Sequence, residues 1–149
     1  MDGPATDLSD AKVRLAAEVD RRRDVLVELS RQIHARPELG YEERFAHDLL
    51  TRLLEDEGIS VTRSARGIET AFEAHAGSAG PTVAVLCEYD ALPAIGHACG
   101  HNVIAAAGLG AGLAAAALAE ELGGRVAVIG TPAEEGGGGK LRLIDAGAF

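Results

Sequence analysis

Two short apolar runs, residues 82–87 (TVAVLC) and 125–129 (RVAVI), constrain the fold most, because polar side chains do not alternate through either of them. Apolar side chains on both faces are typical of a strand in a sheet covered on both sides. Between the runs, residues 102–122 are rich in Ala, Gly and Leu and have the length of a helix. The pattern predicts an α/β fold, with a sheet flanked by helices.

The rest of the chain supplies further elements. Apolar residues recur at helical spacing over residues 7–36, which predicts one long helix with Asp7 or Ser9 as its cap. The arginines at 21–23 within it are expected on a solvated face. A chain of 149 residues suits one domain. The remaining elements are expected at residues 42–57 and from residue 140 onward (helices), and at residues 59–63 and 69–75 (strands).

The charge and the terminus bear on partners and location. A net charge of −9 repels phosphate backbones, so we expect no nucleic-acid partner and favour metal cations instead. Residues 1–4 have neither the basic start nor the apolar run of a signal peptide. Residues 103–119 are mostly Ala and Gly, which predicts a buried helix and no membrane span. A cytoplasmic location is the default expectation.

Polar residues with metal-binding chemistry follow both apolar runs. In an open α/β sheet, ligands bind beyond the carboxyl ends of the strands, so we expect the two loops to face one pocket. Thiolate, imidazole and carboxylate together suit zinc, and imidazole with carboxylate also suits manganese or cobalt. The first loop holds Glu88, Asp90, His97, Cys99 and His101, and the second holds Glu134 and Glu135 before four glycines.

The two adjacent glutamates are expected to have different chemical roles. Two neighbouring carboxylates repel each other unless a cation offsets them. One can bind a metal while the other takes a proton from water, as metal-assisted hydrolysis requires. Each loop alone is equally compatible with an ordinary solvated loop, but their joint position after two apolar strands favours a metal site.

Other chemistry-bearing residues are expected to be structural. His34 at a helix end, His47 on an amphipathic helix and His75 at a strand end are not expected to bind metal, and Cys87 is expected to be a buried free thiol. Residues 108–112 look like a dinucleotide fingerprint but fall inside a helix, not at a strand-to-helix turn. The Gly139–Lys140 pair is not a phosphate loop, because two glutamates precede it.

The chain resembles the M20 family of metallopeptidases and amidohydrolases at residues 33–43, 88–101 and 130–140. It is most similar to the aminobenzoyl-glutamate hydrolase and dipeptidase branch, in which Cys-Gly-His and Pro-Ala-Glu-Glu stand in these places. The resemblance implies a three-layer catalytic domain and a pair of metal ions (zinc, or manganese or cobalt) bridged by water. It also implies small amide or dipeptide substrates.

The resemblance assigns a role to five residues. It implies that Cys99, His101 and Glu135 bind metal and that Glu134 is the general base. Asp90 matches an acidic position that supports the site. Glu88 stands where many members carry a histidine ligand, so its role is open, and His97 is expected to orient Cys99 or the substrate.

Family members are considerably longer than this chain and carry further histidine ligands and an inserted lid or dimerisation domain. We therefore expect residues 1–149 to form the N-terminal part of a catalytic domain. Turnover by this chain alone is not expected, and a non-catalytic metal-binding fragment is the alternative. The 149-residue chain should bind zinc weakly and expose apolar surface at Ile144 and Phe149.

Overall fold

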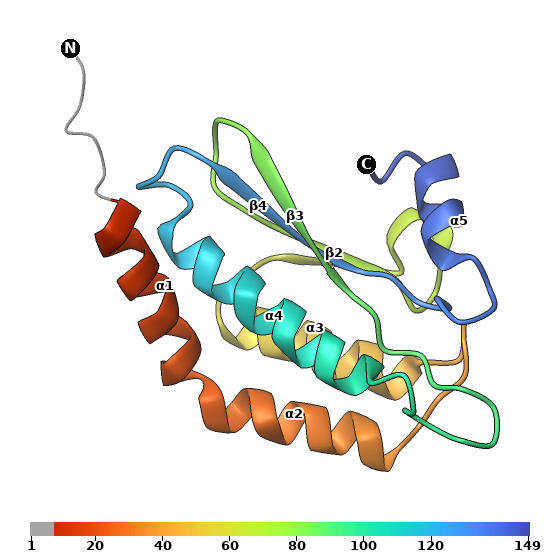
Figure 1. The fold of residues 1–149 in the computed structure, drawn as a ribbon. Helices are drawn as coiled ribbons and strands as arrows, with labels where there is room; N and C mark the ends of the chain where they lie inside the picture. The colour runs from red at the N-terminus through yellow and green to blue at the C-terminus, as the bar shows by residue number, and fades with distance from the viewer. Residues whose placement is uncertain (1–7) are drawn as a thin grey trace.

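A four-stranded mixed sheet forms the centre of the fold (Figure 1). The computed structural model describes residues 8–149, so Asp7 and residues 1–4 lie outside the described part of the chain. β4 pairs antiparallel with β2 and parallel with β3, so β3 and β4 end at the same edge of the sheet. In sheet order the strands are β1 (Val61–Arg63), β2 (Phe72–Ala76), β4 (Arg125–Gly130) and β3 (Thr82–Cys87).

Helices cover one face of this sheet in two tiers (Figure 1). The two inner helices, α3 (Arg44–Asp56) and α4 (His101–Leu118), contact the strands. The outer helices, α1 (Leu8–Arg21) and α2 (Arg23–Ala35), pack on α4. Apolar side chains from α2, α3 and α4 meet the sheet in one core, and these include Leu29, Leu50, Leu109 and Val128.

A short helix, α5 (Gly139–Asp145), covers the opposite face. Its Leu143 packs with Ala127 and Ile129 of β4, whereas Val126 and Val128 belong to the core beneath α4. Since successive side chains of a strand point to opposite faces, α5 and α4 lie on opposite sides of the sheet. The expected sheet flanked by helices in three layers is confirmed, and the 3₁₀ turn η1 (Ala65–Gly67) adds to the smaller layer.

The expected single helix over residues 7–36 is wrong, because the chain bends at Arg22 between α1 and α2. The Arg22 side chain is only 9% exposed and pairs with Glu18 at 2.5 Å and with Glu57 at 2.6 Å. The prediction of a solvated arginine run therefore holds for Arg21 and Arg23 and fails for Arg22. Periodicity did not reveal the bend, because the second partner, Glu57, comes from the end of α3.

The prediction that residues 82–87 are buried on both faces is also wrong. β3 is an edge strand that pairs only with β4 among the described residues, and Val83 is 62% exposed. Of the two apolar runs, the one inside the sheet is β4, whose residues from Val126 to Gly130 are buried. An apolar run therefore identified both strands but did not distinguish the centre of the sheet from its edge.

Glycines let α4 lie close to the sheet. A Cβ atom at Gly108 would stand 2.8 Å from the Leu86 carbonyl oxygen, and one at Gly112 would stand 2.4 Å from Val128 Cγ2. The glycine run at 108–112 therefore serves packing inside a helix, as expected. Although α4 is long and apolar enough to cross a membrane, 56% of that helix is buried inside the fold.

Candidate metal centre

His101 stands at the start of α4 with its imidazole buried. Its Nδ1 atom lies 2.9 Å from Oδ1 of Asp90 and 2.9 Å from the Asp90 carbonyl oxygen. With a proton on Nδ1 to donate to these oxygens, the lone pair of Nε2 is free to bind a cation. Asp90 is itself only 2% exposed, so its contact with the ring is shielded from water.

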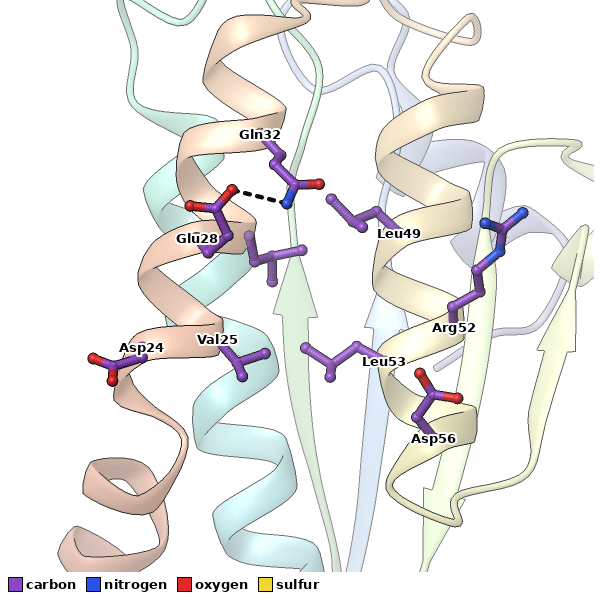
Figure 2. Close-up of a pocket in the computed structure, with 9 residues that line it drawn as sticks. Asp24, Val25, Glu28, Gln32, Leu49, Arg52, Leu53 and Asp56 are labelled. Carbon is purple, nitrogen blue, oxygen red and sulfur yellow. Dashed lines mark hydrogen bonds between the residues drawn. The ribbon is translucent and has the colours of Figure 1, made fainter.

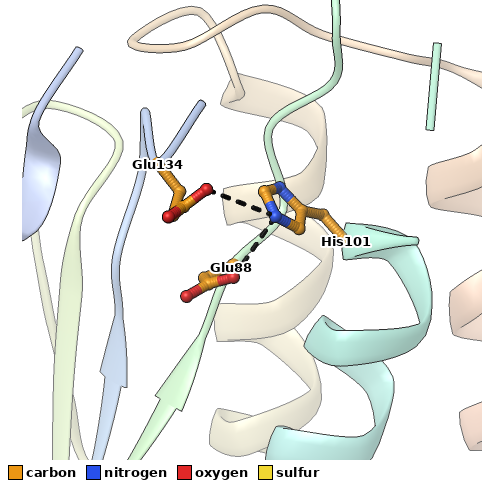
Figure 3. A group of neighbouring side chains, drawn as sticks. All are labelled: Glu88, His101 and Glu134. Carbon is orange, nitrogen blue, oxygen red and sulfur yellow. Dashed lines mark ion pairs between the residues drawn. The ribbon is translucent and has the colours of Figure 1, made fainter. Parts of the chain in front are cut away.

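Three carboxylates surround the Nε2 atom of His101. Glu88 Oε2 lies 3.2 Å away, and Glu134 Oε2 and Glu135 Oε1 each lie 3.7 Å away. Figure 3 shows Glu88 and Glu134 pointing toward the same nitrogen of the imidazole. Glu88 directly follows β3, and the other two lie in the loop after β4, so the parallel pairing of these strands brings them together. The expectation that the two loops face one site is confirmed.

Cys99 also reaches this group, from the exposed side. Its thiol has Glu135 as a hydrogen-bond partner, and this carboxylate, with help from Glu134 and Asp90, raises the pKa of the thiol. Of the predicted ligands, Glu135 lies beside both Cys99 and the His101 ring. The tightest group of potential ligand atoms is a different one, Glu88, His101 and Glu134, whose atoms lie within 4.8 Å of one another. Which residues bind metal stays a prediction.

Asp90 joins the two loops. One oxygen faces His101, and the other, Oδ2, accepts the backbone N–H of Glu135 at 2.9 Å. A single buried carboxylate thus orients the imidazole and anchors the second loop. This geometry agrees with the supporting role that the resemblance implies for Asp90.

Lys140 is a member of the site that the sequence reasoning missed. Its Nζ atom lies 2.5 Å from Oε1 of Glu88 and 4.0 Å from Oε1 of Glu134. In the sequence this lysine is notable only for following a glycine, and no local signal places it beside Glu88. Four carboxylates in this small region (Asp90, Glu88, Glu134, Glu135) outnumber the one lysine, so the donor set fits a divalent cation.

The remaining histidines lie outside the Glu88–His101–Glu134 group. His97 is buried beside the His34 ring, with 6.2 Å between ring centroids, and neither of its nitrogens has a hydrogen-bond partner within residues 8–149. Burial lowers the pKa of His97, and its predicted part in orienting Cys99 stays a prediction. His47 packs edge-on against Phe72, and His75 is exposed on β2.

Two hollows differ in their relation to this centre. A hollow of about 330 Å³ adjoins it, lined by Asp90 and Glu135 together with apolar residues such as Leu92. A groove of about 460 Å³ lies between α2 and α3, with Leu49 and Leu53 reaching into it (Figure 2). The groove shares no lining residue with the metal centre, so the hollow beside Glu135 is the better place for a substrate.

Known proteins of one peptidase family are similar to this chain. The profile of peptidase family M20/M25/M40 matches residues 84–149, the part that contains every residue of the cluster. A solved structure from Bacillus subtilis, described as a dinuclear metal-binding peptidase of the M20 family, superposes with a TM-score of 0.75 at 29% identity. That similarity covers 89% of this chain and 40% of the other. The chain is thus similar to the M20 family, by profile over residues 84–149 and by fold over most of its length.

Two curated relatives are similar to nearly the whole of this chain. The chain is 47% identical to the Xaa-Arg dipeptidase of Mus musculus, over 97% of this chain and 37% of the relative. It is 35% identical to one component of the p-aminobenzoyl-glutamate hydrolase of Escherichia coli K12, over 90% of this chain and 31% of the relative. The chain thus spans about a third of the length of these curated relatives.

Proposed function

We propose that this chain carries part of the catalytic centre of a metal-dependent hydrolase that cleaves amide or peptide bonds in small N-acyl amino acids or dipeptides. The observation that carries the proposal is the position of His101, with Nδ1 held by Asp90 and Nε2 facing Glu88, Glu134 and Glu135. An oriented imidazole among carboxylates is the arrangement that catalytic metal sites use.

The residues present fit a divalent cation, for which zinc, manganese and cobalt are the candidates. His101 Nε2, the Glu135 carboxylate and the Cys99 thiolate would hold it, with Glu88 as a further carboxylate within reach. A bound divalent cation polarises a carbonyl group and makes a water molecule more acidic. The family comparison supports a second ion, since the Bacillus subtilis structure is described as dinuclear.

Glu134 is proposed as the general base. Its side chain is 41% exposed, against 22% for Glu135, so it is the more accessible of the two to a water molecule and a substrate. Asp90 holds the backbone N–H of Glu135 and thereby limits the freedom of its neighbour. In this role the Glu134 carboxylate takes a proton from water on one side of the scissile bond and returns it to the leaving amine.

The named relatives support a short peptide or acylated amino acid as substrate. One is a dipeptidase, one a p-aminobenzoyl-glutamate hydrolase and one an N-acetyl-L-cysteine deacetylase. All three names describe cleavage of a C–N bond next to an amino acid. The hollow beside Asp90 and Glu135 has room for a small side chain of such a substrate.

A second candidate is metal binding without turnover. It is favoured by Ile144 and Phe149, which are 55% and 60% exposed and give the surface apolar groups that can associate. In that case the 149 residues bind zinc and associate but do not hydrolyse a substrate.

The deciding experiment measures hydrolysis of a dipeptide and of an N-acyl amino acid, with zinc and with manganese, by the chain and by Glu134→Gln. Loss of a general base lowers turnover by roughly 10²–10⁴-fold. Metal-dependent turnover that Glu134→Gln removes, with metal still bound, supports the hydrolase. Zinc binding without turnover supports the second candidate, and no metal uptake by a folded chain contradicts both.

A further inference from the structure

We propose that Glu43 is a positioning residue for the loop of residues 131–139, which carries Glu134 and Glu135. Glu43 lies far from this loop in the sequence. It directly precedes the first residue of α3. The geometric part of the proposal stands on contacts within the chain. Its consequence for catalysis rests on the proposed function.

The contact joins a buried carboxylate to a strained turn. Glu43 is 0% exposed, and its Oε1 atom accepts the backbone N–H of Ala133 at 2.8 Å. Ala133 has a φ of 55°, a left-handed conformation that residues other than glycine adopt only where the surroundings enforce it. Since Glu134 follows directly, the direction in which its side chain leaves the backbone depends on this turn.

Neighbours of Glu43 hold the same loop. A Cβ atom at Gly40 would stand 2.9 Å from Ala133 Cβ, so the bare backbone of residue 40 rests against the turn. The Tyr41 hydroxyl donates to the Gly137 carbonyl oxygen at 2.7 Å. Glu38 serves the other loop, because its carbonyl oxygen accepts the N–H of Ala91 at 2.8 Å. Residues 38–43 thus fix the backbone of both loops that bear the metal centre.

A carboxylate at this position is unfavourable for stability alone. Burial raises the pKa of Glu43, and its Oε2 atom has no hydrogen-bond partner among residues 8–149. Burying a polar group that is only partly paired lowers the stability of the folded chain. Polar groups of this kind are found where a local geometry matters more than stability, and here that geometry is the Ala133 turn.

The test compares Glu43→Leu with Glu43→Gln in the ¹⁵N-labelled chain without metal. Leucine has no acceptor for the Ala133 N–H, whereas glutamine keeps a carbonyl oxygen at the position of Oε1. We expect Glu43→Leu to speed hydrogen exchange of the Ala133 amide by about tenfold or more relative to the amides of β4, and Glu43→Gln to leave that ratio nearly unchanged. Unchanged Ala133 exchange in Glu43→Leu overturns the proposal.

Two further variants separate positioning from general loss of stability. Leu50→Ala creates a cavity on the same helix without touching the loop, and it should change exchange at Ala133 and in β4 alike. An Ala133-specific effect in Leu50→Ala would overturn the proposal. Gly40→Ala places a methyl group too close to the Ala133 side chain and should therefore speed hydrogen exchange of the Ala133 amide. This variant tests the turn even if Glu43→Leu does not fold. Normal Ala133 protection in Gly40→Ala would count against it.

The zinc affinity of the same variants tests whether the Ala133 turn positions the metal ligands. Changes to groups that orient a metal ligand typically weaken binding by roughly 10–100-fold, and we expect this for Glu43→Leu and not for Glu43→Gln. Equal zinc affinity in both variants would show that the turn does not position the ligands. If the parent chain binds no zinc, the proposed function fails, while the exchange data still decide the role of Glu43.

Discussion

The Asp90 carboxylate connects His101 to Glu135: Oδ1 lies 2.9 Å from Nδ1 of the imidazole, and Oδ2 lies 2.9 Å from the Glu135 nitrogen. His101 belongs to α4 and Glu135 to the loop after β4, so one side chain sets the separation of two potential ligands that come from different elements. Both of its oxygens face donors.

Asp90→Asn should therefore weaken zinc binding. The amide presents one oxygen and one NH₂ group, so either the His101 N–H or the Glu135 N–H loses its acceptor and meets a donor. We expect the affinity for zinc, measured by calorimetry, to fall roughly 10–100-fold. Asp145→Asn changes charge equally on an exposed part of α5 and is the control. An Asp90→Asn variant that binds zinc as the parent does would contradict the supporting role.

The ligand set can be decided with cobalt. If Cys99 binds the metal, the Co²⁺-loaded chain shows a thiolate charge-transfer band, and Cys99→Ser removes it. Glu88→Gln tests the alternative group of Glu88, His101 and Glu134. We expect Cys99→Ser to abolish the band and to reduce cobalt affinity by on the order of tenfold or more. A parent spectrum without the band would remove Cys99 from the ligand set.

Arg22 should contribute to stability far more than its neighbours in the arginine run. Arg22→Leu removes the buried cation between Glu18 and Glu57 and leaves them only the exposed Arg21, so we expect the free energy of unfolding in urea to fall by about 1–3 kcal/mol. Arg23→Leu, on the exposed side, should change it by about 0.5 kcal/mol or less. Equal effects of the two substitutions would show that the bend at Arg22 does not depend on its ion pairs.

Glu43 should make folding stability depend on pH in a defined direction. Burial raises its pKa in the folded chain above 4.5, so in the window above 4.5 the folded state retains a proton that the unfolded state has lost. This group therefore favours the folded state less as the pH rises through that window. Glu43→Gln, which stays neutral, should gain stability relative to the parent between acid and neutral pH.

Urea unfolding of both proteins below pH 4.5 and at neutral pH measures this difference. Glu55→Gln is the matched control on the same helix, because the Arg63 hydrogen bond lowers the pKa of Glu55. Its substitution should reduce stability at neutral pH and not at low pH. If the stability gained by Glu43→Gln does not grow with pH, the pKa of the buried Glu43 carboxyl group is not raised in the folded chain.

The sequence predicted the elements of the sheet and the loops of the site with few errors. Apolar runs located β3 and β4, because a strand with apolar side chains on both faces has a simple local pattern. The polar clusters after those strands located His101, Cys99 and the two glutamates, because residue type and spacing already specify ligand chemistry. The resemblance to the M20 family followed from the same segments.

Tertiary structure decided everything that depends on partners distant in the chain. Glu57 pairs with Arg22 at the bend between α1 and α2, the strand order leaves β3 at an edge, Lys140 lies against Glu88, and Glu43 reaches Ala133. None of these contacts has a local signature, since each joins residues whose separation in sequence says nothing about their separation in space. Local patterns determine which elements form and which chemistry they carry, whereas packing determines which side chains meet and which carboxylates are buried.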